Sequence, residues 1–565
     1  MERVYETHLL RRSWREDGKV RNETVANLSH LPAGLIEVIR RSLAGEVFVA
    51  ASQAVSVARS LPHGHVAAVW AQAKTLGLAA LLGPAGRDRD LALALIVSRV
   101  IAPGSKLATL GGWADTSLGV DLDVAGASTD EAYAAMDWLL SRQDAIEAKL
   151  AARHLATDAN PDRLAMFDLS SSWMEGRHCA LAKRGYSRDG KKGKLQVEYG
   201  LLTDPGGRPV AVRVFAGNTA DPTAFVQAVD VVRTKFGLTD MVMVGDRGMI
   251  TTARIAALRE LGGMGWLTCL RNPAIAALAA DQGPLQLSLF DQADLAEISH
   301  PDYPNERLIA CCNPALAAER ARKRGELLDA TQTALAPIIA AVTAGRLHGG
   351  AAIGRRVEKA IGKYKMAKHF DITITDTTLT ATRNQARIDT EAALDGIYVI
   401  RTSVPATDLD TAAAVGTYKN LSRVEREFRS MKADDLDLRP IFHRLEDRVR
   451  AHILICMLAA YLTWHLRRAW APLTYTDQKP PQRVNPVAPA TRSTTATAKA
   501  SRRRDEHDQP LHDFRGLLDH LATLTRNHLR VTGQDQSGFD LLAIPTPTQR
   551  RAFELIDAPI PLTLK

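Results

Sequence analysis

The sequence predicts an α/β core that is interrupted by a long insertion and preceded by a mainly helical domain. Three observations indicate this fold class. Residues 31–157 show helical apolar spacing almost throughout, and residues 160–271 alternate strand and helix patterns. Residues 272–417 break that alternation before helical spacing returns in residues 418–471. We therefore expect a mixed sheet flanked by helices, with an α+β insertion before its last helices.

The totals limit the class of protein. The chain has 565 residues, of which 46% are hydrophobic and 24% charged, and a formal net charge of +9. These values are typical of globular protein with two to four domains and a modest bias towards polyanions. Five cysteines without ligand spacing argue for a reducing compartment and against structural zinc. With a charged N-terminus and an apolar segment at 451–466 too short to span a bilayer, we expect a cytoplasmic protein with no membrane contact.

The first third of the chain predicts a hairpin and then helices. Residues 1–30 hold two strand-like runs around the turn signal "EDGK" at 16–19. In residues 31–157, segments such as "DLALALIVSRVIA" and "STDEAYAAMDWLLS" have Ser, Thr or Asp starts and apolar spacing of three to four. We interpret this region as a separate all-α domain.

The core begins at a change of pattern near residue 164. "LAMFDLSSSWM" has no helical period and predicts a buried strand, and "LQVEYGLLTD" and "RPVAVRVFAGN" predict a hairpin around Pro-Gly-Gly. Helix, strand, helix and strand patterns follow in "PTAFVQAVDVVRTKF", "DMVMVGD", "TTARIAALREL" and "GWLTCL". The insertion at 272–417 includes one long helix pattern and a basic segment. After the core, residues 472–505 are rich in Pro, Thr, Ala and Arg and predict a flexible linker, and 506–565 a small tail.

Three acids stand in three separate predicted elements of the core. Asp168 lies inside a buried strand run, Asp246 ends another, and Glu425 lies on a helix predicted over 418–432. Taken alone, Asp246 could cap a helix or bond to Arg247, and Glu425 could be a solvated ion pair. A shared task explains all three better, because charges in buried strands are costly unless compensated. Grouped carboxylates offer only oxygen ligands, which suit Mg²⁺ or Mn²⁺. Two such ions held together can promote cleavage of a phosphodiester.

The helix at 418–432 has a chemically distinctive edge. Tyr418, Glu425 and Lys432 recur every seven residues and border an apolar stripe of Leu421, Val424, Phe428 and Met431. The edge therefore presents a phenol, a carboxylate and an ammonium in one direction.

These features together resemble the DDE transposases of bacterial insertion sequences. The resemblance is carried by the two strand acids, the insertion before the glutamate helix, "GNTADP" at 217–222, "GDRGM" around Asp246, and "RPIFHRLEDRVRAH" at 439–452. One branch of that family has Tyr, two residues, Arg, three residues, Glu, six residues and Lys on its last core helix. The chain has Tyr418, Glu425 and Lys432 at these spacings, but Leu421 replaces the arginine. The resemblance covers about residues 160–475.

The resemblance implies an RNase H-like core in which Asp168, Asp246 and Glu425 hold two Mg²⁺ or Mn²⁺ ions. It also implies that Tyr418 and Lys432 contact DNA phosphates. Arg429 lies about 40° from Glu425 on the helix and could replace the missing arginine. The partner would be double-stranded DNA, as terminal inverted repeats and target, bound by a homodimer in the nucleoid without a small-molecule cofactor. The N-terminal helical domain would then bind the DNA ends.

Two basic segments support DNA as the partner. Residues 183–194 carry six basic side chains against one acid, including Lys191, Lys192 and Lys194, and residues 354–369 carry six against one. Either segment alone could be a solvated surface, but both flank the predicted active site. Asn218 and Arg247 are secondary site candidates, and Asn218 is as easily a turn residue.

Two other functions stay open from the sequence. One is a nuclease of the same fold that hydrolyses DNA without joining ends. The other is a catalytically silent DNA-binding protein derived from a transposase, although three intact acids argue against it. A sugar hydrolase with paired carboxylates is poorly supported, because aromatic residues are only 5% of the chain.

Overall fold

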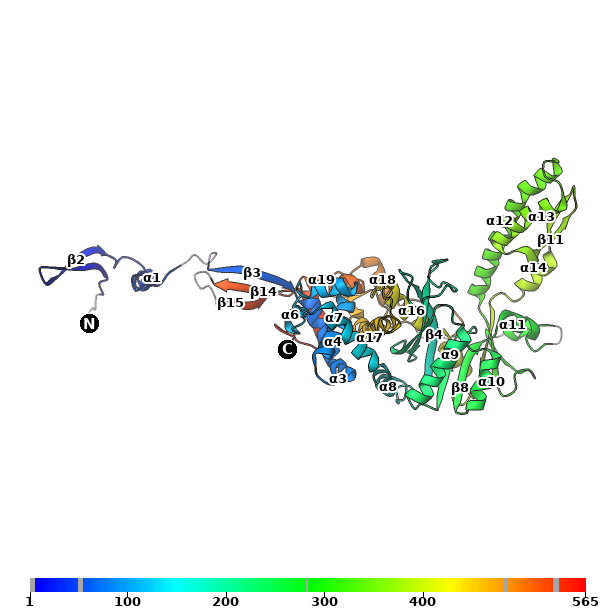
Figure 1. The fold of residues 1–565 in the computed structure, drawn as a ribbon, viewed down its shortest axis with the longest axis horizontal. Coiled ribbons are helices and arrows are strands. Elements are labelled where there is room, and N and C mark those ends of the chain that lie inside the picture. The colour runs from blue at the N-terminus through cyan, green and yellow to red at the C-terminus, as the bar shows by residue number, and fades with distance from the viewer. Residues whose placement is uncertain are drawn as a thin grey trace. The chain divides into compact units, whose positions relative to one another are not determined.

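The structure is a computed structural model that describes residues 6–48, 54–280, 283–291, 293–481, 485–531 and 538–564. The chain divides into two units. The smaller unit combines residues 1–61 with 525–543, and the larger unit combines 62–524 with 544–565 (Figure 1).

The smaller unit is built from strands of both chain ends. Strands β1 (Leu9–Glu16) and β2 (Lys19–Asn27) pair antiparallel, and Asp17 and Gly18 between them both have positive φ. This is the backbone that a tight Asp-Gly hairpin turn requires. Helix α1 (Ala33–Leu43) follows. A second sheet has the order β15-β14-β3, with β3 (Val55–Pro62), β14 (Thr525–Val531) and β15 (Gly538–Leu542).

Helices from distant parts of the sequence share one core in the larger unit. Helix α17 (Glu446–Ala469) packs against α2, α4 and α7, and most of its residues are fully buried. The N-terminal helices are α2 (Gly64–Thr75), α3 (Leu78–Leu82), α4 (Arg87–Ile101), α5 (Lys106–Trp113), α6 (Ser117–Asp121), α7 (Thr129–Ser141) and α8 (Gln143–His154).

This shared core corrects the expectation of a separate helical domain over 31–157. Its first residues belong to the smaller unit and include the strand β3, and its remainder encloses α17. By length and composition α17 could cross a membrane, but 83% of the apolar window is buried inside the protein. Such burial is typical of a core helix.

A mixed sheet runs through the larger unit. Among the described residues it has eight strands in the order β6-β5-β4-β7-β8-β13-β10-β9. Strands β4, β5 and β6 are antiparallel neighbours, β4 is parallel to β7 and β7 to β8, and the remaining neighbours are antiparallel. The strands are β4 (Leu164–Trp173), β5 (Gln196–Thr203), β6 (Pro209–Ala216), β7 (Met241–Val244), β8 (Met264–Cys269), β9 (Leu295–Ile298), β10 (Arg307–Cys312) and β13 (Ile397–Thr402).

Helices cover both faces of this sheet. Phe225 of α9 (Asp221–Asp230) contacts Phe167 on one face, and Phe428 of α16 (Leu421–Arg429) contacts Tyr199 on the other. The faces are opposite because Tyr199 pairs with Ser170, and Ser170 and Phe167 lie an odd number of residues apart on β4. The π-turn η2 (Val231–Lys235) extends α9, and α10 (Thr252–Leu261) joins β7 to β8.

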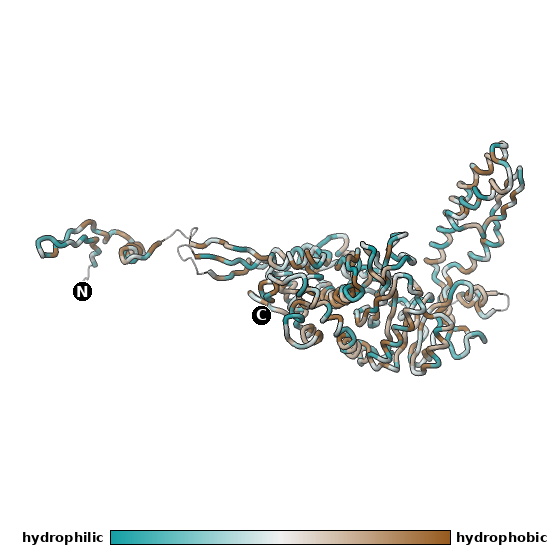
Figure 2. The backbone as a smooth tube through the Cα atoms, viewed as in Figure 1, coloured by the Kyte–Doolittle hydropathy of each residue, from teal (hydrophilic) through white to brown (hydrophobic). Residues whose placement is uncertain are grey.

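The insertion has two parts. Strands β9, β10 and β13 continue the central sheet beyond β8, and α11 (Asn272–Leu278) and η3 (Leu287–Phe290) accompany them. The second part has its own apolar core and alternates hydrophobic and hydrophilic stretches along its chain (Figure 2). It comprises α12 (Pro314–Thr343), α13 (Gly350–Tyr364), η4 (Ala367–His369), β11 (Phe370–Ile374), β12 (Leu379–Arg383) and α14 (Gln385–Ala392). We call this second part the arm.

Residues 472–505 differ from the expected flexible linker. The described residues include η6 (Ala471–Leu473) and α18 (Thr494–Arg502), and Val487 is fully buried. Lys499 of α18 donates to the carbonyl of Ala471 at 3.1 Å, and Lys419 donates to the carbonyl of Val487 at 2.7 Å. The C-terminal tail is likewise structured: in addition to β14 and β15 it includes α19 (Phe514–Ala522) and α20 (Pro547–Glu554). Composition missed this order because the contacts are made to residues remote in sequence.

Candidate active site

Asp168 lies in the middle of β4, on the face of the sheet that α16 covers. Its side chain points to the same side as Ser170 and Tyr199, because strand side chains alternate and Ser170 pairs with Tyr199. One carboxylate oxygen accepts from the backbone N–H of Leu169 at 2.8 Å. Burial raises the pKa of Asp168 to about 7, and the charges of Glu425 and Asp246 act in the same direction.

Asp246 lies just past the end of β7, level with Asp168. In the parallel pair of β4 and β7, Met166 is opposite Val244, so Asp168 and Asp246 each lie two residues beyond a matched position. Asp246 is exposed, and one of its carboxylate oxygens accepts from the backbone N–H of Arg247 at 2.7 Å. The sheet register therefore places the two aspartates at the same level on neighbouring strands.

Glu425 is exposed on α16, which packs against β4 and buries Val424 and Phe428, the latter against Tyr199 of β5. The helix predicted over 418–432 is in fact three successive segments. Helix α15 (Thr411–Lys419) ends before Asn420, α16 follows, and the last turns form the π-helix η5 (Ser430–Asp434). The break and the wider π-turn mean that the three edge residues do not share one regular helix.

The three carboxylates influence one another electrostatically, and among the described residues none of them makes an ion pair. Asp168 experiences the charges of both other acids. No three His, Cys, Asp or Glu side chains in these ranges are close enough together to enclose one ion. The donor set still fits a divalent cation, because it offers only carboxylate oxygens and its own repulsion favours added positive charge.

Two expected DNA contacts are engaged inside the protein. Burial raises the pKa of Tyr418, whose half-buried side chain interacts with the thiol of Cys269 and lies near Asp246. Lys432 is buried, and its ammonium donates to Asp189 at 2.9 Å. Burial lowers the pKa of Lys432, although the carboxylate of Asp189 opposes that shift.

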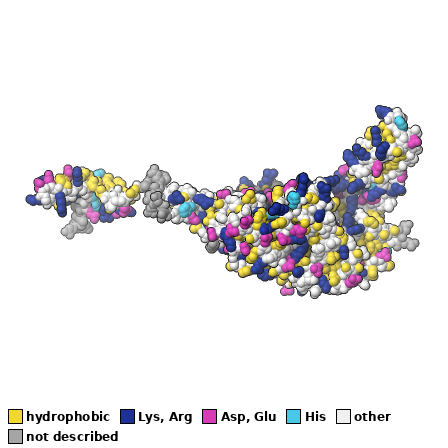
Figure 3. Space-filling view, viewed as in Figure 1, with side chains coloured by type: hydrophobic (Ala, Val, Ile, Leu, Met, Phe, Trp, Pro, Cys, Tyr) yellow, Lys and Arg dark blue, Asp and Glu magenta, His cyan; other side chains and the backbone are white. Residues whose placement is uncertain are grey.

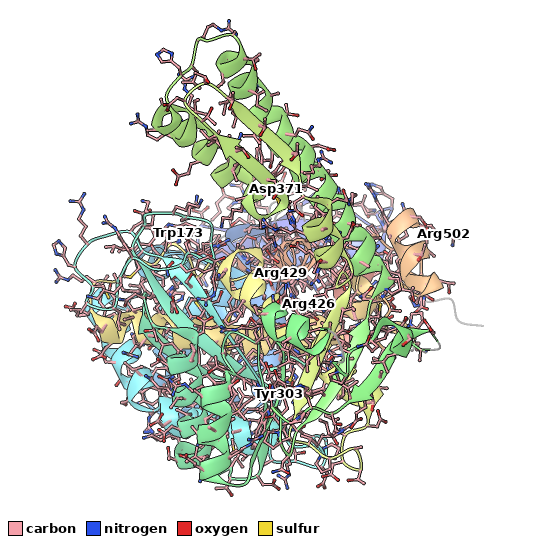
Figure 4. All side chains as sticks on the ribbon, turned by 90° about the vertical axis from the view of Figure 1, so that its right-hand side faces the viewer. Trp173, Tyr303, Asp371, Arg426, Arg429 and Arg502 are labelled. Atoms are coloured by element: carbon pink, nitrogen blue, oxygen red, sulfur yellow. The ribbon has the colours of Figure 1, made fainter. Side chains whose placement is uncertain are left out.

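The other predicted DNA contacts are exposed. Arg429 has no ion pair in the part of the chain that the structure describes, and it projects from α16 beside Arg426 (Figure 4). Lys191 and Lys192 are exposed in the basic loop, whereas Lys194 pairs with Glu175 at 3.2 Å. The secondary candidates differ: Arg247 donates to Asn272 at 3.1 Å, and Asn218 is an exposed residue after β6.

Sequence reasoning missed a charged cluster beside the three acids. Arg188 donates to Asp221 at 2.6 Å, lies 3.6 Å from Glu198, and its charge lowers the pKa of Asp168. Burial raises the pKa of Glu198 to about 7. The available signals were an acid in the buried run "LQVEYGLL" and the aspartate of "GNTADP", neither of which shows its partner in the sequence.

Comparison with known protein families decides the identity. The family model described as a transposase DDE domain matches residues 152–462. This range is more than half of the chain and includes all three acids. The chain belongs to the DDE transposase family. Residues 2–53 match the N-terminal domain of IS1634 family transposases. This DDE transposase is accordingly an insertion-sequence enzyme that cleaves and joins DNA and depends on divalent metal.

Other comparisons add little to this DDE transposase. No protein with a curated description matches it. A cryo-EM structure of a piggyBac transposase synaptic complex with hairpin DNA covers 71% of this chain and 71% of that chain at 8% identity. Its TM-score is 0.32, so it places no residue of this chain.

Proposed function

We propose that Asp168, Asp246 and Glu425 are the catalytic acids of this transposase, held in an RNase H-like core. The observation that carries the proposal is the placement of the three acids: the register of β4 and β7 sets Asp168 and Asp246 level with each other, and α16, which carries Glu425, packs on the face of β4 to which Asp168 points. The strand order supports the fold: β4, with the first acid, lies between an antiparallel neighbour, β5, and a parallel neighbour, β7.

The three acids would hold two Mg²⁺ or Mn²⁺ ions. When bound, such ions activate a water or a 3′-hydroxyl and stabilise the leaving oxygen of a phosphodiester. The chain's own contribution is to fix the ligands. The backbone N–H groups of Leu169 and Arg247 orient the two aspartates, and the buried Val424 and Phe428 fix the height of Glu425 above β4.

DNA would be held by exposed cations around these acids. Arg429, Lys191 and Lys192 are the direct candidates, because Tyr418 and Lys432 could contact phosphate only by leaving Cys269 and Asp189. The arm adds five exposed cations on and beside α13, none with an ion pair in the described residues: Arg355, Arg356, Lys359, Lys363 and Lys365. Figure 3 shows Lys and Arg side chains over the arm. Such a face suits backbone phosphates.

The remaining parts of the proposal concern assembly. The residues of the smaller unit and the N-terminal helices would recognise the terminal inverted repeats. Two protomers would bind two DNA ends, as the resemblance implies, and the enzyme would act in the cytoplasm on nucleoid DNA.

The experiment uses purified protein, a labelled duplex with the element's own end, and Mg²⁺. We compare the natural protein with Glu425→Gln, and with Asp434→Asn as a control that removes an exposed carboxylate from the same helical stretch. We expect Glu425→Gln to keep DNA binding and to lose cleavage and end joining at least a hundredfold, while Asp434→Asn keeps both. Equal cleavage by Glu425→Gln and the natural protein would overturn the assignment of Glu425.

A further inference from the structure

The basic loop 183–194 is fixed by two neighbouring residues of opposite charge. Arg188 is paired with Asp221 and Glu198 beside the active site, whereas Asp189 is paired with Lys432 and Arg439. One oxygen of Asp189 accepts from Lys432 at 2.9 Å and from Arg439, and the other accepts from the backbone N–H of Trp173 at 3.3 Å. The Asp189 side chain is only 1% exposed. This buried carboxylate therefore ties the loop to β4 and to the segment after η5.

The charges around Asp189 do not cancel. Two cations, Lys432 and Arg439, face one carboxylate, so the cluster keeps a net positive charge. The Lys432 side chain is 9% exposed, whereas the Arg439 side chain is 25% exposed. Arg439 is thus the cation of the cluster that can reach a ligand while it stays paired with Asp189. An anionic ligand would balance the net positive charge of the cluster.

Trp173 extends this cluster to the surface. The Arg439 guanidinium lies 5.2 Å from the centre of the Trp173 ring, and the Lys191 ammonium lies 5.3 Å from it. Lys191 has no ion pair among the residues that the structure describes, unlike Lys194, which is paired with Glu175. Trp173 is half-buried at the end of β4 (Figure 4). An aromatic surface between two cations suits a phosphate with its neighbouring sugar or base.

We propose that Trp173, Arg439 and Lys191 bind a backbone phosphate of the DNA, and that Asp189 is the positioning residue that orients Arg439. The proposal rests on the active site proposed above, because the same strand carries Asp168. Trp173 is five residues beyond Asp168, about 17 Å along β4. Because strand side chains alternate and the two residues are an odd number apart, the side chains of Trp173 and Asp168 leave opposite faces of β4, so the bound phosphate is a different one from the reacting phosphate.

The first test measures the salt dependence of DNA binding. The probe is the labelled end duplex, and the variants are Lys191→Gln, Arg439→Gln and the matched control Lys194→Gln. Loss of one phosphate contact lowers the slope of log affinity against log salt by about 1. We expect this loss for Lys191→Gln and Arg439→Gln and a smaller change for Lys194→Gln, whose charge Glu175 already offsets. Equal slopes for Lys191→Gln and Lys194→Gln would overturn the phosphate site.

The second test separates positioning from charge. Asp189→Asn removes a negative charge near DNA, so charge alone predicts tighter binding. If Asp189 positions Arg439, Asp189→Asn should instead have the same salt slope as Arg439→Gln. The double variant should then show no further loss of slope. Asp189→Glu, which keeps the charge, should keep the natural slope and guards against a variant that merely unfolds. The positioning role is refuted if Asp189→Asn binds DNA more tightly and if adding Arg439→Gln to it still lowers the salt slope by the full amount.

A control distinguishes failure of this inference from failure of the active-site proposal. Glu425→Gln is measured in both assays and should bind DNA with the natural salt slope while losing cleavage. If it cleaves normally, the active site is wrongly assigned, whereas the slopes of Lys191→Gln and Arg439→Gln still decide the phosphate site.

Discussion

Phe428 is the side chain whose alteration best tests whether packing sets the position of Glu425. It is 4% exposed on α16, three residues after Glu425, and meets Tyr199 of β5 edge-on at a ring-centre distance of 5.7 Å. Phe428→Leu keeps an apolar side chain but loses the aromatic pair, worth about 0.5–1.5 kcal/mol, and some packing volume. We expect the free energy of unfolding to fall by about 1–2 kcal/mol. Because a protein of ordinary stability has roughly 5–15 kcal/mol, the variant stays folded.

Catalysis should suffer more than stability. A displacement of about 1 Å at a catalytic group costs about a hundredfold in rate, so we expect cleavage by Phe428→Leu to fall about ten- to a hundredfold at saturating DNA. The matched control is Phe225→Leu on α9, which is 1% exposed and meets Phe167 on the opposite face of the same sheet. Its unfolding free energy should fall similarly, with less than a threefold loss of cleavage.

The assays are chemical denaturation followed by circular dichroism, and single-turnover cleavage of the end duplex at a temperature where both variants are folded. Equal losses of cleavage in the two variants would refute the reasoning, because α16 would then have no special part in placing Glu425. Unchanged cleavage in Phe428→Leu, despite the expected loss of stability, would refute it too.

Three further predictions follow from other contacts. Glu147 is fully buried and paired with Arg213, so Arg213→Met should lower the unfolding free energy by about 3–5 kcal/mol. Burial already raises the pKa of Glu147 and Arg213 opposes it, so the variant's folded-state pKa rises further. The loss of unfolding free energy should therefore be small below the unfolded glutamate pKa of about 4.3 and should grow as the pH rises through the folded-state pKa. Denaturation of both proteins at pH 5 and pH 8 measures this difference, and an equal loss at the two pH values would contradict the prediction. Removal of divalent metal with a chelator should abolish cleavage and leave duplex binding, with recovery on adding Mn²⁺; cleavage that persists in chelator would exclude the metal-dependent mechanism. On the arm, Lys359→Gln should reduce the salt slope of DNA binding by about 1, whereas Lys368→Gln, whose cation is paired with Glu391, should change it less, and identical slopes would remove the arm from the DNA interface.

The sequence by itself determined the local elements and the candidate residues for the chemistry. Apolar periodicity is a local property, so it gave the strand with Asp168, the strand before Asp246 and the helical stretch with Glu425. The Asp17–Gly18 turn is similarly local, because it depends on the backbone freedom of two adjacent residues. Family resemblance then supplied the transposase function that the family match shows.

Only the tertiary structure decided which distant segments meet. The pairing of β13 with β8, which makes part of the insertion an extension of the central sheet, depends on registers between residues remote in sequence. The burial of α17 by the N-terminal helices is decided in the same way. Lys432 shows the consequence for a site: the family resemblance implied a phosphate contact, but Asp189, on a loop far earlier in the chain, occupies its ammonium. Helical spacing gives the direction of a side chain, whereas its partner is set by the packing of other elements, and no local pattern contains that information.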